Sequence, residues 1–205
     1  MTTAWISDAL AAHKEWVASA GAAGKRLSEV GLDLSGADLS GAVLHDCVLP
    51  EAKLSGATLD RADLSSGFLN GATLDGASLR NAVLVKAQFD DTSLIGSVLT
   101  GANCLRTTFD GAMLRDANLM QASLRKTAFS NTDLRNANLA GSHIHNTFFD
   151  NGTKVAGLIL WRAEICSFHV NWIDIAEEGD PQRLDGEEAE QWIRARATIA
   201  PQRRL

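Results

Sequence analysis

An apolar residue recurs at every fifth position between Leu34 and Phe149, without a single insertion or deletion. Of these 24 positions, 18 are Leu and four are Phe, and Cys104 and Ile144 fill the other two. A small residue, most often Ala, stands two positions before each of them. The exception is Leu34, where Leu32 takes this place. Helices repeat their apolar positions about every 3.6 residues and strands about every two, so a period of five fits neither. It predicts a chain that points a small and then a large side chain inward and then turns a corner.

Four Phe residues are spaced 20 positions apart, which is four units of five. They are Phe89, Phe109, Phe129 and Phe149. This spacing predicts that each coil contains four units and that the rings form one interior column. In the same column the small residue changes from Ala87 to Thr107, Thr127 and Thr147. Successive coils should lie about 4.8 Å apart, as neighbouring strands do, so the rings can stack with an offset. The repeat therefore predicts a rod of about six coils, roughly 29 Å long.

Triplets such as Ala37-Asp38-Leu39 and Ala137-Asn138-Leu139 carry a resemblance to a known family. Over residues 32–151 the chain resembles the pentapeptide-repeat family, whose consensus is A-(D/N)-L-x-x. The resemblance implies an all-β solenoid, a right-handed quadrilateral β-helix. The handedness follows from the resemblance alone.

The two ends of such a stack need caps, because unpaired backbone groups at an open edge favour aggregation. We expect residues 1–31 to form an N-terminal helical cap, residues 32–151 the β-helix, and residues 152–205 a C-terminal module. Residues 3–19 predict an amphipathic helix that Gly21 and Gly24 end. This lead-in resembles that of many bacterial and phage members of the family.

The register of the repeat breaks at Lys154. Residues 158–161 and 168–175 then predict strands, and residues 186–198 predict a helix with acidic residues near its start and arginines near its end. Trp161, Phe168 and Trp172 are the candidate contact residues of this module. Two interpretations stay open: a homodimer formed through the module, or a cap folded onto its own chain.

Composition excludes several classes of function. The net charge of −6 and the pI near 5.3 argue against direct nucleic-acid binding. The sequence has neither an apolar run of membrane-spanning length nor a signal-peptide pattern. Its three cysteines, at irregular spacing, suggest no disulfide framework. We therefore expect a cytoplasmic protein that acts without a membrane.

The sequence contains none of the common catalytic, phosphate-binding or zinc-binding motifs. Asp90, Asp110 and Asp150 should align at one corner, where the repeat itself favours Asp. His143 and His145 should point outward without a third metal ligand, and Cys104 should be a buried, inert thiol. We expect no enzymatic activity, no cofactor and no metal. The less favoured alternative is an enzyme domain in the C-terminal module.

Apolar residues in outward positions are the more informative deviations. Val83, Val85 and Leu105 fall on one side in adjacent coils and form the candidate interaction surface. Met113 and Met120 also point outward, on other faces. We therefore predict a protein–protein interaction scaffold with a protein partner that the sequence does not identify.

The alternative is a DNA mimic that binds DNA gyrase and protects it from quinolones or peptide toxins, as some members of the family do. Such mimicry needs carboxylates arrayed like phosphates on one face. Residues 32–151 hold 13 acidic and 9 basic residues, a net charge of only −4. Five basic residues gather late in the repeat and are expected to interrupt an acidic stripe. They are Arg106, Arg115, Arg125, Lys126 and Arg135.

Overall fold

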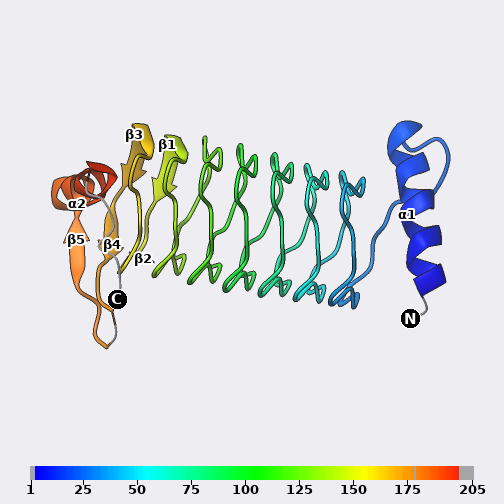
Figure 1. The fold of residues 1–205 in the computed structure, drawn as a ribbon, viewed down its shortest axis with the longest axis horizontal. Helices are drawn as coiled ribbons and strands as arrows, with labels where there is room; N and C mark the ends of the chain where they lie inside the picture. Colours follow the sequence, from blue (N-terminus) through cyan, green and yellow to red (C-terminus); the bar gives the residue numbers. More distant parts are fainter. Residues whose placement is uncertain (1–2, 178, 199–205) are drawn as a thin grey trace.

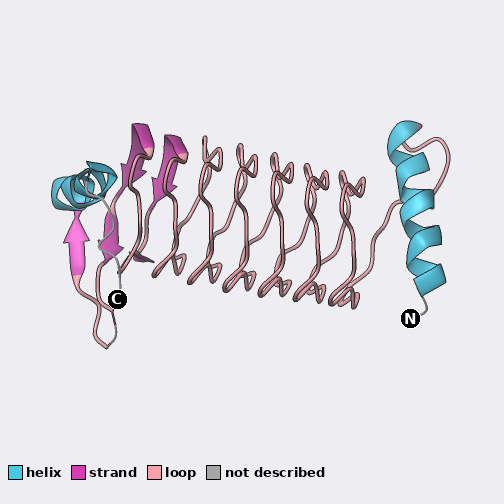
Figure 2. Ribbon diagram, in the orientation of Figure 1, coloured by secondary structure: helices cyan, strands magenta, loops and turns pink. Residues whose placement is uncertain are grey.

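The fold was analysed in a computed structural model, which describes residues 3–177 and 179–198 (Figure 1). A long stack of coils lies between a helix at the N-terminal end and a small group of strands and a helix at the C-terminal end (Figures 1 and 2). The elements are α1 (Thr3–Ala18), β1 (His143–Phe149), β2 (Thr153–Lys154), β3 (Glu164–Val170), β4 (Trp172–Asp174), β5 (Arg183–Asp185) and α2 (Gly186–Thr198). No helix in this described part is long and apolar enough to cross a membrane.

The stack is held together by parallel backbone bridges between residues 20 positions apart. They run without interruption from the pair Ser28 and Val48 to the pair Ala128 and Phe148. Each five-residue unit contributes one bridge residue, so a coil contains four units. This confirms the 20-residue coil that the Phe spacing predicts, and the chain is a β-helix solenoid.

The core consists of the apolar column and the small-residue column of each side. The Leu and Phe side chains at the five-residue positions are almost completely buried. Phe89, Phe109, Phe129 and Phe149 stack with successive ring centroids 5.5 Å apart, as predicted. The change from Ala to Thr beside them has a physical reason. Thr107 Oγ1 donates to the carbonyl of Leu84 at 2.7 Å, and Thr127 Oγ1 donates to that of Cys104 at 2.8 Å. These buried hydroxyls therefore tie one coil to the one before it.

The coil continues past residue 151, where the repeat pattern ends. Asp133 bridges Lys154, 21 residues later, because one extra residue enters at the corner before β2. Gly152 takes up this insertion with φ 84°, and a Cβ there would overlap the ring of Trp172. β3 then pairs in parallel with β1, and β4 with β2. The register break at Lys154 is therefore an insertion within the ladder, and part of the 152–205 module extends the β-helix itself.

The expected N-terminal helix is present as α1 and lies across the first coil (Figure 1). It ends at Ala18, and Gly21 and Gly24 follow with positive φ values of 87° and 73°. Gly24 is required at its position, because a Cβ would overlap the backbone of Ala12 and Trp16. This close approach lets the chain turn directly from the helix into the first coil.

At the other end, β5 pairs antiparallel with β4, and α2 packs against the last coil through Ala189 and Ile193, which are fully buried. The aromatic residues predicted for a dimer or cap all contact their own chain. Phe168 meets Phe149 edge to face at 6.2 Å, Trp172 stacks under Arg183, and Trp161 stacks under Arg162. These contacts favour the cap interpretation.

Candidate interaction surfaces

Each five-residue unit sends two side chains into the core and three outward. The outward ones are the bridge residue between the two core residues and the two corner residues that follow. Because the coils stack at 20-residue intervals, every outward position forms a column along the rod. Four bridge columns therefore define four faces, and pairs of corner columns separate one face from the next.

The predicted surface of Val83, Val85 and Leu105 spans two neighbouring columns. Val83 lies in a bridge column, and Val85 and Leu105 follow each other in the next corner column, where the amide of Lys86 donates to the Leu105 carbonyl at 2.9 Å. All three side chains are half-buried, because each is flanked by the coils above and below. The patch is thus flatter than the sequence suggests.

The most exposed large apolar side chains of the described part are elsewhere. Val30 is 72% exposed, Met113 43% and Phe148 40%. The sequence predicted that Met113 points outward, but the exposure of Val30 and Phe148 was not predicted. Phe148 stacks on His169 with centroids 4.7 Å apart. A Phe in a bridge position, directly before the core Phe149, was the signal that could have found it.

Four cations gather at the corner that carries Val85 and Leu105, and we call this set the basic corner. It consists of Lys86, Arg106, Arg125 and Lys126. The Arg106 amide donates to the Arg125 carbonyl at 3.0 Å, so the cations stack in consecutive coils. All four side chains are exposed, and none has a carboxylate of the described residues within ion-pair distance. The apolar patch therefore borders a row of unpaired positive charge.

Five carboxylates occupy the next corner along the chain, and we call this set the acidic corner. It consists of Glu51, Asp90, Asp91, Asp110 and Asp150. Two of them also hold the stack together. Asp90 accepts from the amide of Asp110 at 3.2 Å, and Asp110 from that of Ser130 at 3.0 Å. Burial raises the pKa of Asp110, and the charge of Asp90 adds to this effect.

The expectation that basic residues interrupt the acidic stripe is wrong. The corner positions that align with Asp90 and Asp91 in the other coils carry no Lys or Arg. Arg115 and Arg135 lie at a different corner, where both contact Asp133, at 3.7 and 2.6 Å. The remaining three, Arg106, Arg125 and Lys126, belong to the basic corner together with Lys86. The 20-residue coil thus sorts charges that look mixed in the sequence.

The predicted titratable sites are structural. Ile144 is buried, and the exposed His143 pairs with Glu164 through Nδ1 and Oε2 at 2.7 Å. Among the described residues, no three His, Cys, Asp or Glu side chains are grouped to hold a metal ion. Cys104 is fully buried, as predicted, and burial raises its pKa to about 12.

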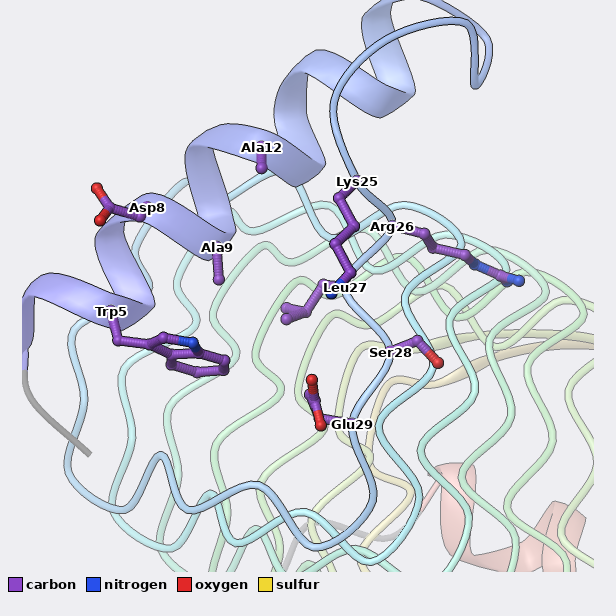
Figure 3. A pocket seen from close by; sticks show the side chains of 9 residues that line it. All are labelled: Trp5, Asp8, Ala9, Ala12, Lys25, Arg26, Leu27, Ser28 and Glu29. Atoms are coloured by element: carbon purple, nitrogen blue, oxygen red, sulfur yellow. The ribbon is translucent and has the colours of Figure 1, made fainter.

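A pocket of about 260 Å³ lies between α1 and the first coil (Figure 3). Trp5 and Leu27 contribute its apolar walls. Lys25 and Glu29 stand on the chain that enters the coil, with Glu29 lower in the view. Asp8, Arg26 and Ser28 line the pocket as well, and among the described residues no hydrogen bond or ion pair joins the side chain of Ser28 or Lys25 to a carboxylate of the pocket. The pocket is the space left where a round helix meets a flat coil.

These columns define a class of protein, a β-helix solenoid with a filled core. Its charged side chains stand on the outer surface. The chain belongs to the pentapeptide-repeat family. The family's pentapeptide repeats match in eight copies, at residues 30–65, 59–94, 69–101, 87–125 and 117–152. No curated protein matches the chain.

Solved structures of pentapeptide-repeat proteins are similar to this chain. HetL, involved in heterocyst differentiation regulation in the cyanobacterium Nostoc sp. strain PCC 7120, is 23% identical over 73% of this chain and 79% of its own, with a TM-score of 0.35. QnrB1, a plasmid-mediated fluoroquinolone resistance protein, is 16% identical over 85% of this chain and 98% of its own, with a TM-score of 0.49. Rfr23 from the cyanobacterium Cyanothece 51142 is 27% identical over 55% and 84%, with a TM-score of 0.20.

Proposed function

We propose that this protein is a non-enzymatic protein–protein interaction scaffold of the cytoplasm. A right-handed quadrilateral β-helix of about six coils serves as the rigid support, and Val83, Val85 and Leu105 form the interaction surface. One observation carries the proposal: the outward apolar patch borders four exposed cations that have no partner among the described residues. An apolar centre with a polar rim is the usual anatomy of a protein interface.

The filled core supports a role without catalysis. Leu, Phe, Ala and Thr side chains occupy the interior at nearly full burial, so the core enclosed by the four faces holds no room for a substrate. A protein of this shape acts through its surface, and the fold alone does not name the partner.

The test is a quantitative capture of binding proteins from native lysate with the full chain as bait. Leu105→Glu places a carboxylate in the centre of the patch, and we expect it to reduce the recovery of specific partners at least tenfold, as loss of a central contact does. Met120→Glu is the matched control, because Met120 is a half-buried first corner residue at another corner. Equal recovery with both variants would show that the patch is not the binding surface.

The DNA-mimic function remains the second candidate, because no Lys or Arg stands in the acidic corner, where the sequence suggested interruption. Against it, the basic corner lies only one face away. Purified gyrase distinguishes the two: a mimic inhibits supercoiling or protects it from a fluoroquinolone, and replacing Asp91 by Asn and Glu51 by Gln weakens the effect. If the natural chain is not a mimic, its expression in cells should leave their fluoroquinolone susceptibility unchanged.

For the C-terminal module, residues 152–205, we propose the role of a cap that covers the last coil. The contacts of Trp161, Phe168 and Trp172 within their own chain support this role over a homodimer. Trp172→Ala should then lower the unfolding temperature without changing the oligomeric state.

A further inference from the structure

One face of the rod differs from the other three. Its bridge column carries no charged side chain, and we call it the Phe face. After Ser28 at its start, the column consists of Val48, Phe68, Gln88, Thr108, Ala128 and Phe148. Each of the other faces has at least one charged bridge residue, such as Asp33, Asp38 or Asp63. Phe148, Gln88 and Ser28 are exposed on the Phe face, and Val48, Phe68, Thr108 and Ala128 are half-buried.

The two edges of the Phe face carry opposite charge. The basic corner directly precedes it along the chain, and the acidic corner directly follows it. Within one coil, Lys86 stands at one edge and Asp91 at the other. In the next coil the two edges carry Arg106 and Asp110. Over these two coils the face is therefore an uncharged strip between a positive and a negative border, whereas in the first coil Asp46 and Glu51 place a carboxylate at each edge.

We propose that the Phe face binds the Phe face of a second copy of this chain, with the two rods parallel. A two-fold axis parallel to the rod exchanges the left and right edges of the face and keeps the height of every coil. The basic corner of one copy then lies against the acidic corner of the other, and Lys86 faces Asp91 of the second copy. Symmetry repeats each such contact twice, as in any two-fold interface.

The antiparallel arrangement is disfavoured by the same charges. A two-fold axis perpendicular to the rod does not exchange the two edges of the face. The acidic corner of one copy would then lie against the acidic corner of the other. Like charges brought together at an interface disfavour association. Charge complementarity thus selects both the occupant of the face and its direction.

The strength of the association follows from its size. Six bridge positions at about 4.8 Å spacing give a strip roughly 24 Å long. Such a strip belongs to the smallest class of specific interfaces, below about 1,200 Å² in total. Exposed ion pairs are screened over about 10 Å at 0.1 M salt. We therefore expect a weak dimer that dissociates as the salt concentration rises.

Sedimentation equilibrium of the full chain tests the proposal with two charge reversals. Lys86→Asp and Asp91→Lys each place like charges in both symmetric contacts, so each variant alone should be monomeric under conditions where the natural chain dimerises. When the two variants are mixed, every such contact joins opposite charges again, and a mixed dimer should form. High salt should weaken the natural dimer at least tenfold.

Folding does not confound this test. Both positions are exposed corner residues with positive φ, 60° at Lys86 and 56° at Asp91, and the chain already places both Lys and Asp in this conformation. Arg61→Asp and Asp116→Lys are matched controls at other corners, with φ 60° and 59°, and should leave dimerisation unchanged. Circular dichroism confirms the fold of each variant.

Three results would overturn the proposal. They are a natural chain that stays monomeric at low salt, single reversals that still dimerise, and a mixture that does not regain the dimer. A dimer that Trp172→Ala abolishes would place the contact in the C-terminal module instead. The interaction proposed for Val83, Val85 and Leu105 is tested separately by Leu105→Glu, so either proposal can fail without the other.

Discussion

His13 Nδ1 accepts a hydrogen bond from the backbone amide of Leu27 at 3.0 Å, and this bond fastens α1 to the first coil. The His13 ring is fully buried and stacks on Trp16 with centroids 5.8 Å apart. An imidazole nitrogen accepts a hydrogen bond only when it is unprotonated. The N-terminal cap is therefore held by a histidine that must be neutral.

This arrangement predicts an acid-sensitive cap. Burial lowers the pKa of His13 below its ordinary value of 6.5, with a further contribution from Arg26, while the His45 backbone and Asp46 oppose the shift. His45, also titratable, adds to the lowering. Because the folded-state pKa is below the unfolded one, the stabilisation is complete above about pH 6.5 and is lost as the pH falls through the folded value.

The measurement is the melting temperature between pH 7.5 and pH 5. Each 1 kcal/mol lost should lower it by about 2–4 °C for a chain of this size. His13→Asn keeps an acceptor near the position of Nδ1 but does not titrate, and should flatten this part of the profile. An unchanged profile would mean that protonation of His13 does not loosen the cap.

The Phe column predicts a graded loss of stability. Phe109→Ala should lower the free energy of unfolding by about 3–5 kcal/mol, because it opens a cavity between two stacked rings. Phe109→Leu should cost less than half of this, since the same column holds Leu49 and Leu69 in earlier coils. Phe148→Ala, on the surface, should change stability by less than about 1 kcal/mol. Urea denaturation distinguishes the three variants.

Gly152 and Trp172 should be coupled. Gly152→Ala adds a Cβ that overlaps the indole ring at a residue with φ 84°, so we expect a loss of about 1–3 kcal/mol for the backbone conformation and more for the overlap. In a Gly152→Ala, Trp172→Ala double variant the overlap is relieved. The losses should then be less than additive by about 0.5–3 kcal/mol, whereas strict additivity would contradict the contact.

The cysteines should differ sharply in reactivity. Burial raises the pKa of Cys47 and Cys104 to about 12, whereas Cys166 is an exposed free thiol. A thiol reagent should therefore modify one cysteine in the native protein and all three in denaturant. Rapid modification of Cys104 in the native state would mean that the core opens readily.

The β-helix could be predicted from the sequence because two independent spacings specify its geometry. The five-residue period defines the unit, and the spacing of Phe89, Phe109, Phe129 and Phe149 defines the coil. The extension beyond residue 151 was missed for a physical reason. One inserted residue at Gly152 shifts every later position, and Val155, Leu158 and Leu160 then fill core positions without the Ala-Asp-Leu pattern.

The interaction surfaces were harder to predict. The outward direction of Val83, Val85 and Leu105 follows from the repeat, but their half-buried state depends on neighbours 20 residues away. The charges of Lys86 and Asp91 look unremarkable in sequence. Only their positions at opposite edges of the Phe face, repeated in the next coil, turn them into borders of opposite sign.

Native mass spectrometry of an equimolar mixture of Lys86→Asp and Asp91→Lys, one of them isotopically labelled, tests most directly whether the surface columns determine association. The proposed parallel contact predicts a mixed dimer as the main dimeric species, with both variants monomeric when measured alone. Homodimers and mixed dimers in statistical proportions, or no dimer at all, would contradict it.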